Sequence, residues 1–115
     1  MNRTLLSLAL VINVTLPLAA QTTRIVQTNA AGDEALVIDP VTNKVVLHIT
    51  DLEAAHGVTT SPDGTRAYFT VESDSTVKAY DLKTGKLQGS VKLSGHPNNI
   101  AVSKDGKRIF AGIVS

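Results

Sequence analysis

The sequence contains no cysteine and no tryptophan, and only two tyrosines and two phenylalanines among its 115 residues. The absence of cysteine excludes disulfides, thiolate metal sites, cysteine nucleophiles and the acylated cysteine of a lipoprotein. Any stability of the folded chain must therefore come from packing.

Neither sign of charge is in excess. The chain has 11 Lys and Arg against 10 Asp and Glu, a formal net charge of +1 and a pI near 8.1. Nucleic-acid-binding proteins usually carry a basic face, a pI above about 9 and aromatic residues that stack on bases. The balance of charge and the few aromatic residues predict that nucleic acid is not a partner.

The first 20 residues resemble a targeting segment. A short cationic start, MNR, precedes the run TLLSLALVINVTLPL, which polar residues and a proline interrupt and which is too short for a stable membrane span. We expect residues 1–20 to be a signal peptide cut after Ala20, and 21–115 to be the mature, periplasmic or secreted chain. Because Leu18 is larger than the small residue preferred at such a site, an uncut anchor is the alternative.

A repeat of 42 residues runs through the remainder of the chain. The phrase SPDG at 61–64 returns as SKDG at 103–106. The same offset relates two further sets: Asp39, Thr42 and Lys44 with Asp81, Thr84 and Lys86, and Arg24 with Arg66 and Arg108. A fixed period of this length is typical of solenoids, propellers and repeat arrays.

Each period contains four short runs of strand-forming residues separated by turn residues. The expected strands are 57–60 and 99–102, then 66–71 and 108–114, then 34–38 and 76–80, and finally 45–50 and 87–93. The second strand is apolar on both faces and is expected to be buried inside its sheet. In the fourth strand, alternation places Val45, Leu47 and Ile49 inward and Val46, His48 and Thr50 outward, so His48 is expected to be exposed.

The turns between these strands carry their own chemistry. Gly64, Gly85, Gly106 and Asn43 stand where a positive φ is needed, because glycine and asparagine adopt it at least cost. The aspartates at the turns are expected to accept hydrogen bonds from backbone N–H groups, and so to serve structure and not acid–base chemistry. They are Asp39, Asp63, Asp81 and Asp105.

A repeating unit of four strands predicts an all-β fold built from β-propeller blades of four antiparallel strands, with about two blades present. Closed propellers use about 4–8 blades, and about three repeats are the minimum for stability. We therefore expect 21–115 to be a partial propeller, either an N-terminal fragment of a longer chain or one of several copies that assemble into a ring.

The repeat resembles that of the YVTN-type β-propellers. The resemblance rests on HGVTTSPDGTRAYFTVESDSTVKAYDLKTGKLQGSVKLSG at 56–95 and on IDPVTNKVV before it, and it covers residues 24–115. Proteins of this type are exported or surface repeat proteins, and similar repeats build lactonase-like hydrolases and the propeller domains of nitrite and nitrous-oxide reductases. The WD40 repeat is the nearest alternative. It is disfavoured because Tyr80 replaces its tryptophan, His56 lies too close to the SPDG turn, and export is uncommon there.

Candidate functional residues are expected in the segments that lead from an outer strand to the next inner strand, at 51–57 and 94–99. In a propeller these segments approach the central channel, so His56, His96, Asn98 and Asn99 are candidate ligand-binding residues. The alternative is that they only shape turns. No nucleophile motif, phosphate loop or metal-spaced cluster occurs, so no catalytic residue, metal site or cofactor is expected.

Two classes of function remain open at this point. The first is a non-catalytic, exported module that binds a protein or a small ligand or acts as a scaffold. The second is the front end of a propeller enzyme, hydrolytic or redox-linked, and only the resemblance suggests it. The expected partners are an unknown protein or small molecule and either the remaining blades of a longer chain or further copies of this one.

Overall fold

All regular structure in the described chain consists of β-strands. The computed structural model describes residues 22–114, so the predicted signal peptide lies outside the described residues. The strands are β1 (Ile25–Thr28), β2 (Ala35–Asp39), β3 (Lys44–Ile49), β4 (Ala55–Thr60), β5 (Arg66–Val71), β6 (Thr76–Asp81), β7 (Leu87–Lys92), β8 (His96–Val102) and β9 (Ile109–Val114). Between residues 22 and 114 no helix is long and apolar enough to cross a membrane.

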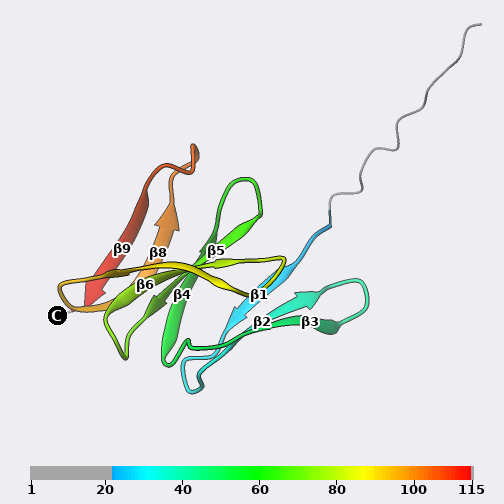
Figure 1. Ribbon diagram of the computed structural model, residues 1–115, viewed down its shortest axis with the longest axis horizontal. Coiled ribbons are helices and arrows are strands. Elements are labelled where there is room, and N and C mark those ends of the chain that lie inside the picture. The colour runs from blue at the N-terminus through cyan, green and yellow to red at the C-terminus, as the bar shows by residue number, and fades with distance from the viewer. Residues whose placement is uncertain (1–21, 115) are drawn as a thin grey trace, which may run out of the picture.

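The strands form three antiparallel sheets that follow one another in chain order (Figure 1). Blade 1 contains β1–β3, blade 2 contains β4–β7, and blade 3 contains β8 and β9. In each sheet the strands pair with their neighbours in sequence, which is the arrangement expected when short turns join them. The predicted all-β fold is confirmed, and blade 2 is a complete unit of four antiparallel strands.

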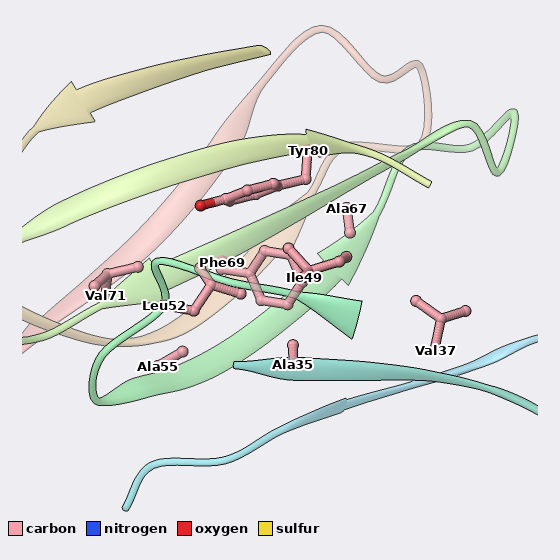
Figure 2. Close-up of a cluster of buried hydrophobic side chains, with 9 residues drawn as sticks. All are labelled: Ala35, Val37, Ile49, Leu52, Ala55, Ala67, Phe69, Val71 and Tyr80. Atoms are coloured by element: carbon pink, nitrogen blue, oxygen red, sulfur yellow. The ribbon is translucent and has the colours of Figure 1, made fainter. Parts of the chain in front are cut away.

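The hydrophobic core lies between blade 1 and blade 2 (Figure 2). Phe69 of β5 is fully buried and meets Tyr80 of β6 edge to face, with ring centroids 5.7 Å apart. The Tyr80 hydroxyl donates a 3.0 Å hydrogen bond to the Thr50 carbonyl, so the ring is buried without an unsatisfied polar atom. Blade 1 contributes Ala35, Val37 and Ile49 to this core, the loop between β3 and β4 contributes Leu52, and blade 2 contributes Ala55, Ala67 and Val71.

The expected burial of the second strand is confirmed in blade 2 and wrong in blade 3. Every residue of β5 after Arg66 is buried. In β9, by contrast, Phe110 is 57% exposed and Ile113 is 44% exposed. The physical reason is that β5 lies between β4 and β6, whereas β9 pairs only with β8.

The predicted alternation along the fourth strand fails at Val45, which is 43% exposed and not turned inward. A β-bulge causes the difference. The register of β2 and β3 shifts between Val37, which pairs with Leu47, and Ile38, which pairs with Val45, so Val46 is an extra residue. Such a residue breaks the two-residue period of side-chain direction. Leu47 and Ile49 keep the predicted inward direction, and His48 is exposed as expected.

The turn predictions are confirmed. Asn43, Gly64, Gly85 and Gly106 all have φ between 56° and 71°. Each turn aspartate accepts a backbone N–H, from Val41 at Asp39, Thr65 at Asp63, Lys83 and Thr84 at Asp81, and Lys107 at Asp105. The Ser61 hydroxyl and then Thr65 lower the pKa of Asp63 to about 2, and the corresponding bonds lower the pKa of Asp81 and of Asp105.

Candidate functional site

The described chain has two distinct ends, because every sheet is a meander. The loops after β1, β3, β5 and β7 lie together at one end, which we call the loop face. Backbone hydrogen bonds join these loops, from Leu52 to Asp33, from Glu72 to Ala54 and from Leu93 to Ser75. The turns after β2, β4, β6 and β8 lie at the opposite end, the turn face.

The four candidate residues lie at the loop-face ends of strands and not in the loops that we predicted. His56 belongs to β4, and His96, Asn98 and Asn99 belong to β8. Each strand begins earlier than expected because it contains a β-bulge, between Ala55 and Val58 in β4 and between Pro97 and Ile100 in β8. The bulge accommodates an extra residue while the strand stays paired, and bulges often redirect side chains beside functional sites.

Glu72 joins two of the candidates across the boundary between blades. His56 Nε2 lies 2.6 Å from Glu72 Oε2, and His96 Nδ1 lies 3.6 Å from Glu72 Oε1. The Glu72 carboxylate therefore uses a different oxygen for each imidazole. His56 is in blade 2 and His96 is in blade 3, so these contacts connect two blades. The three side chains remain accessible, with 34% of His56, 40% of Glu72 and 65% of His96 exposed.

Sequence reasoning missed Glu72, although a signal for it was present. Glu72 is the first residue after the second strand of its blade. In a four-stranded meander the loop after the second strand lies at the same end as the segment before the first strand. A carboxylate at this place was therefore bound to lie near the residues that we selected at 51–57 and 94–99.

The two asparagines are placed differently. The backbone carbonyl of Asn98 accepts a 2.6 Å hydrogen bond from the Thr70 hydroxyl, and the carbonyl of His56 accepts one of 3.0 Å from Thr28. Both bonds link consecutive blades. The donor threonines, Thr28 and Thr70, are 42 residues apart, and so are the acceptor positions 56 and 98. Within residues 22–114, neither asparagine side chain makes a hydrogen bond, so no contact brings Asn99 into the histidine cluster.

The loop face is acidic, whereas the turn face is basic. Six carboxylates lie on the loop face, with only Lys78 and Lys92 among the described lysines and arginines there: Asp33, Glu34, Asp51, Glu53, Glu72 and Asp74. A hollow of about 410 Å³ is lined by four of these carboxylates together with Ser73 and Lys78. The Lys78 amine lies 3.0 Å from Asp74 Oδ2 and donates to the Asp51 carbonyl.

The histidine cluster is suited to holding a ligand by hydrogen bonds. When Nε2–H of His56 donates to Glu72, its Nδ1 is left as an acceptor, and the second ring nitrogen of each imidazole contacts no described residue. No serine, threonine or lysine side chain of the described chain makes a hydrogen bond to either imidazole, so no nucleophile–base pair is formed. Nor do residues 22–114 contain a group of three or more His, Cys, Asp or Glu that could hold a metal ion.

No protein-family profile and no curated protein matches the chain. Solved structures that are similar to it include the following three. Hydrazine synthase of Kuenenia stuttgartiensis is 21% identical, with a TM-score of 0.75, over 78% of this chain and 26% of that chain. The dihydro-heme d1 dehydrogenase NirN, solved in complex with DHE, is 27% identical, with a TM-score of 0.70, over 80% of this chain and 20% of that chain. The WD40 β-propeller domain of Doa1 is 17% identical, with a TM-score of 0.69, over 78% of this chain and 30% of that chain.

These similarities confirm the β-propeller fold. The chain spans about a fifth to a third of the length of each structure named. Within residues 22–114, blade 1 has three strands and blade 3 has two. The similar proteins include both enzymes and a WD40 domain, so the fold by itself does not select an activity.

Proposed function

We propose that the chain belongs to an exported, YVTN-type β-propeller that acts as a non-catalytic binding or scaffold module. A small ligand or a protein would contact its loop face at His56, Glu72 and His96. The proposal rests chiefly on the shared carboxylate, which holds partly exposed histidines of two consecutive blades while their second ring nitrogens have no hydrogen-bond partner among residues 22–114. The repeat text supports the family and the composition of residues 1–20 supports export.

A binding role fits these contacts better than a catalytic one. Exposed histidine–carboxylate pairs contribute only about 0–1 kcal/mol to stability, so folding alone gives little reason to join two imidazoles through Glu72. A ligand held at this point would contact two blades at once. Such a ligand would order the boundary between them, and the protein would be more stable with the ligand than without it.

The proposal can be tested by ligand screening with the full chain. A library of small polar molecules and peptides is screened for those that raise the unfolding temperature, and each positive result is repeated with Glu72→Gln and His96→Ala. We expect both variants to lose the effect. His48→Ala is the matched control, because His48 also pairs with an exposed carboxylate, Glu34 at 2.8 Å, away from the cluster. Ligands that stabilise all four proteins equally would contradict the proposed site.

The second candidate is the front end of a propeller enzyme, lactonase-like or redox-linked. It is favoured by the similarity to hydrazine synthase and to NirN, at TM-scores of 0.75 and 0.70. Sequencing the gene downstream of the codon for Ser115 would distinguish the two candidates. Further repeats of the same kind would support the binding module, and a haem-binding or cupredoxin-like domain would support the enzyme.

A further inference from the structure

A groove opens on the turn face between blade 1 and blade 2, at the opposite end from the histidine cluster. Its volume is about 590 Å³, which is within the range of about 300–1,000 Å³ typical of small-molecule sites. The floor is apolar and is formed by Val26, Val37, Leu47 and Leu82. Val37 is almost fully buried, and the other three pack against the core.

The internal repeat explains why there is space at this point. Val26 corresponds to Tyr68 and to Phe110 in the following blades, at offsets of 42. Phe69 points toward blade 1, so its neighbour Tyr68 points to the other side, toward blade 3, where it is only 9% exposed. Two of the three repeats thus carry an aromatic ring where blade 1 has an isopropyl group. The groove is a departure from the repeat, whereas a feature required for folding would recur in every blade.

The rim of the groove carries a net positive charge. Arg24, Asp81 and Lys83 line it, which gives two cations against one carboxylate and a net charge of +1. The Asp81 carboxylate accepts hydrogen bonds from the backbone of Lys83 and Thr84 and from the Thr84 hydroxyl. The guanidinium of Arg24 lies 3.8 Å from Asp39. The exposed Lys83 ammonium, in contrast, makes no hydrogen bond or ion pair with residues 22–114, although its charge acts on the neighbouring Asp81 carboxylate.

We propose that this groove binds a monoanionic amphiphile, namely a carboxylate that carries a short aliphatic or aromatic body. The body lies on Val26, Leu47 and Leu82, and the carboxylate pairs with the ammonium of Lys83. The net charge of +1 on the rim matches a single negative charge, and the Lys83 ammonium has no hydrogen bond or ion pair to give up. The apolar floor gains from every methylene removed from water. The site lies apart from the loop face, so the proposal does not depend on the function proposed above.

Photo-crosslinking of the full chain tests the proposal. The probe is an aliphatic carboxylate that bears a diazirine, and mass spectrometry of proteolytic fragments locates the label. We expect label on β1 and on the turn between β6 and β7, and we expect hexanoate to compete with the probe whereas hexylamine does not. Equal competition by the amine, or label confined to β8 and β9, would overturn the proposal.

Two variants test the two halves of the site. Lys83→Gln removes the ammonium from an exposed turn, and should raise the hexanoate concentration needed for half-competition about fivefold, the weakening expected for loss of an exposed ion pair. Lys104→Gln is the matched control, because Lys104 is an exposed turn lysine outside the groove. Labelling that is the same in Lys83→Gln as in wild type would refute the assigned role of this residue.

Val26→Tyr introduces at position 26 the aromatic ring that the next repeat carries at Tyr68. This ring should fill the groove and abolish its labelling. If this variant does not fold, the comparison of Lys83→Gln with Lys104→Gln decides the question alone. His96→Ala should leave the labelling unchanged, since the histidine cluster lies on the other face. Loss of labelling in His96→Ala would show that the two faces are not independent and would contradict the proposal.

Discussion

The hydroxyl of Thr70 donates a 2.6 Å hydrogen bond to the backbone carbonyl of Asn98 and so joins blade 2 to blade 3. Thr28 makes the same bond, at 3.0 Å, to the carbonyl of His56 and joins blade 1 to blade 2. Gly112 occupies the equivalent position in blade 3. These bonds lie at the inner, loop-face side of the sheets, beside the histidine cluster.

The Thr70 bond should contribute measurably to stability. Thr70 is fully buried and its oxygen also accepts the Gly57 N–H at 2.8 Å. Thr70→Val keeps the shape of the side chain but leaves both backbone partners without a hydrogen bond, so we expect the free energy of unfolding to fall by about 1–3 kcal/mol. Urea denaturation measures the change, and Thr70→Ser, which keeps the hydroxyl, should recover most of it. A valine variant as stable as wild type would show that water replaces the lost donor.

Gly64 should resist substitution because of its backbone alone. Its φ is +70°, and a Cβ added there would meet no atom within 4 Å. We expect Gly64→Val to lower the free energy of unfolding by about 1 kcal/mol or more through backbone strain, without any steric clash. Gly89→Val is the control, since a Cβ on Gly89 also meets open space but its φ is not positive. Equal losses in the two variants would contradict the role of φ.

Acid should destabilise the folded chain through the turn aspartates. The pKa of Asp63 falls from 3.8 to about 2 on folding, so its contribution to stability is complete above pH 3.8 and is lost as the pH falls toward 2. Asp81 and Asp105 shift in the same direction. We expect the unfolding temperature to decline over this window, and Asp63→Asn to make the decline shallower. Asp33→Asn should leave it unchanged, because the Asp33 side chain makes no hydrogen bond within residues 22–114.

Purified residues 21–115 should not behave as a well-folded monomer. Phe110, Ile113 and Val114 of β9 are 57%, 44% and 55% exposed, and one edge of this strand is unpaired among the described residues. Exposed apolar strands of this kind promote association. Light scattering and thermal unfolding at several protein concentrations test this expectation, and Phe110→Lys should reduce the association. A sharp, concentration-independent transition by a species of monomer mass would be the contrary result.

The sequence predicts the strands and turns well because both depend on short-range chemistry that the repeat displays more than once. Asp63 and Asp105 occupy the same turn position in two repeats, and Gly64 and Gly106 share a positive φ. Burial is predicted less well, since it depends on neighbours that the local pattern does not specify. Tyr68 and Phe110 occupy the same position of the repeat, but only Tyr68 belongs to a strand that lies between two strands of its own sheet, and it is 9% exposed against 57% for Phe110.

The candidate site was predicted in part. His56 and His96 were selected because their segments approach the central channel of a propeller, and the structure joins them through Glu72. The strand positions were missed because a β-bulge leaves no clear mark in a single copy of the pattern. The same bulge does recur, between Ala55 and Val58 in β4 and between Pro97 and Ile100 in β8, 42 residues apart. Thr28 and Thr70 recur at this spacing as well, and a closer comparison of the repeats would have identified them.

The links between blades also bear on how such a protein can change during evolution. Thr28 and Thr70 bond to main-chain oxygens, which every amino acid provides, so the identity of residues 56 and 98 matters little for docking one blade on the next. A propeller whose blades are linked in this way can carry new side chains at these loop-face positions while its blades stay packed on one another. Randomising positions 56 and 98 together should therefore yield many folded variants, a starting collection for selecting binders of new molecules.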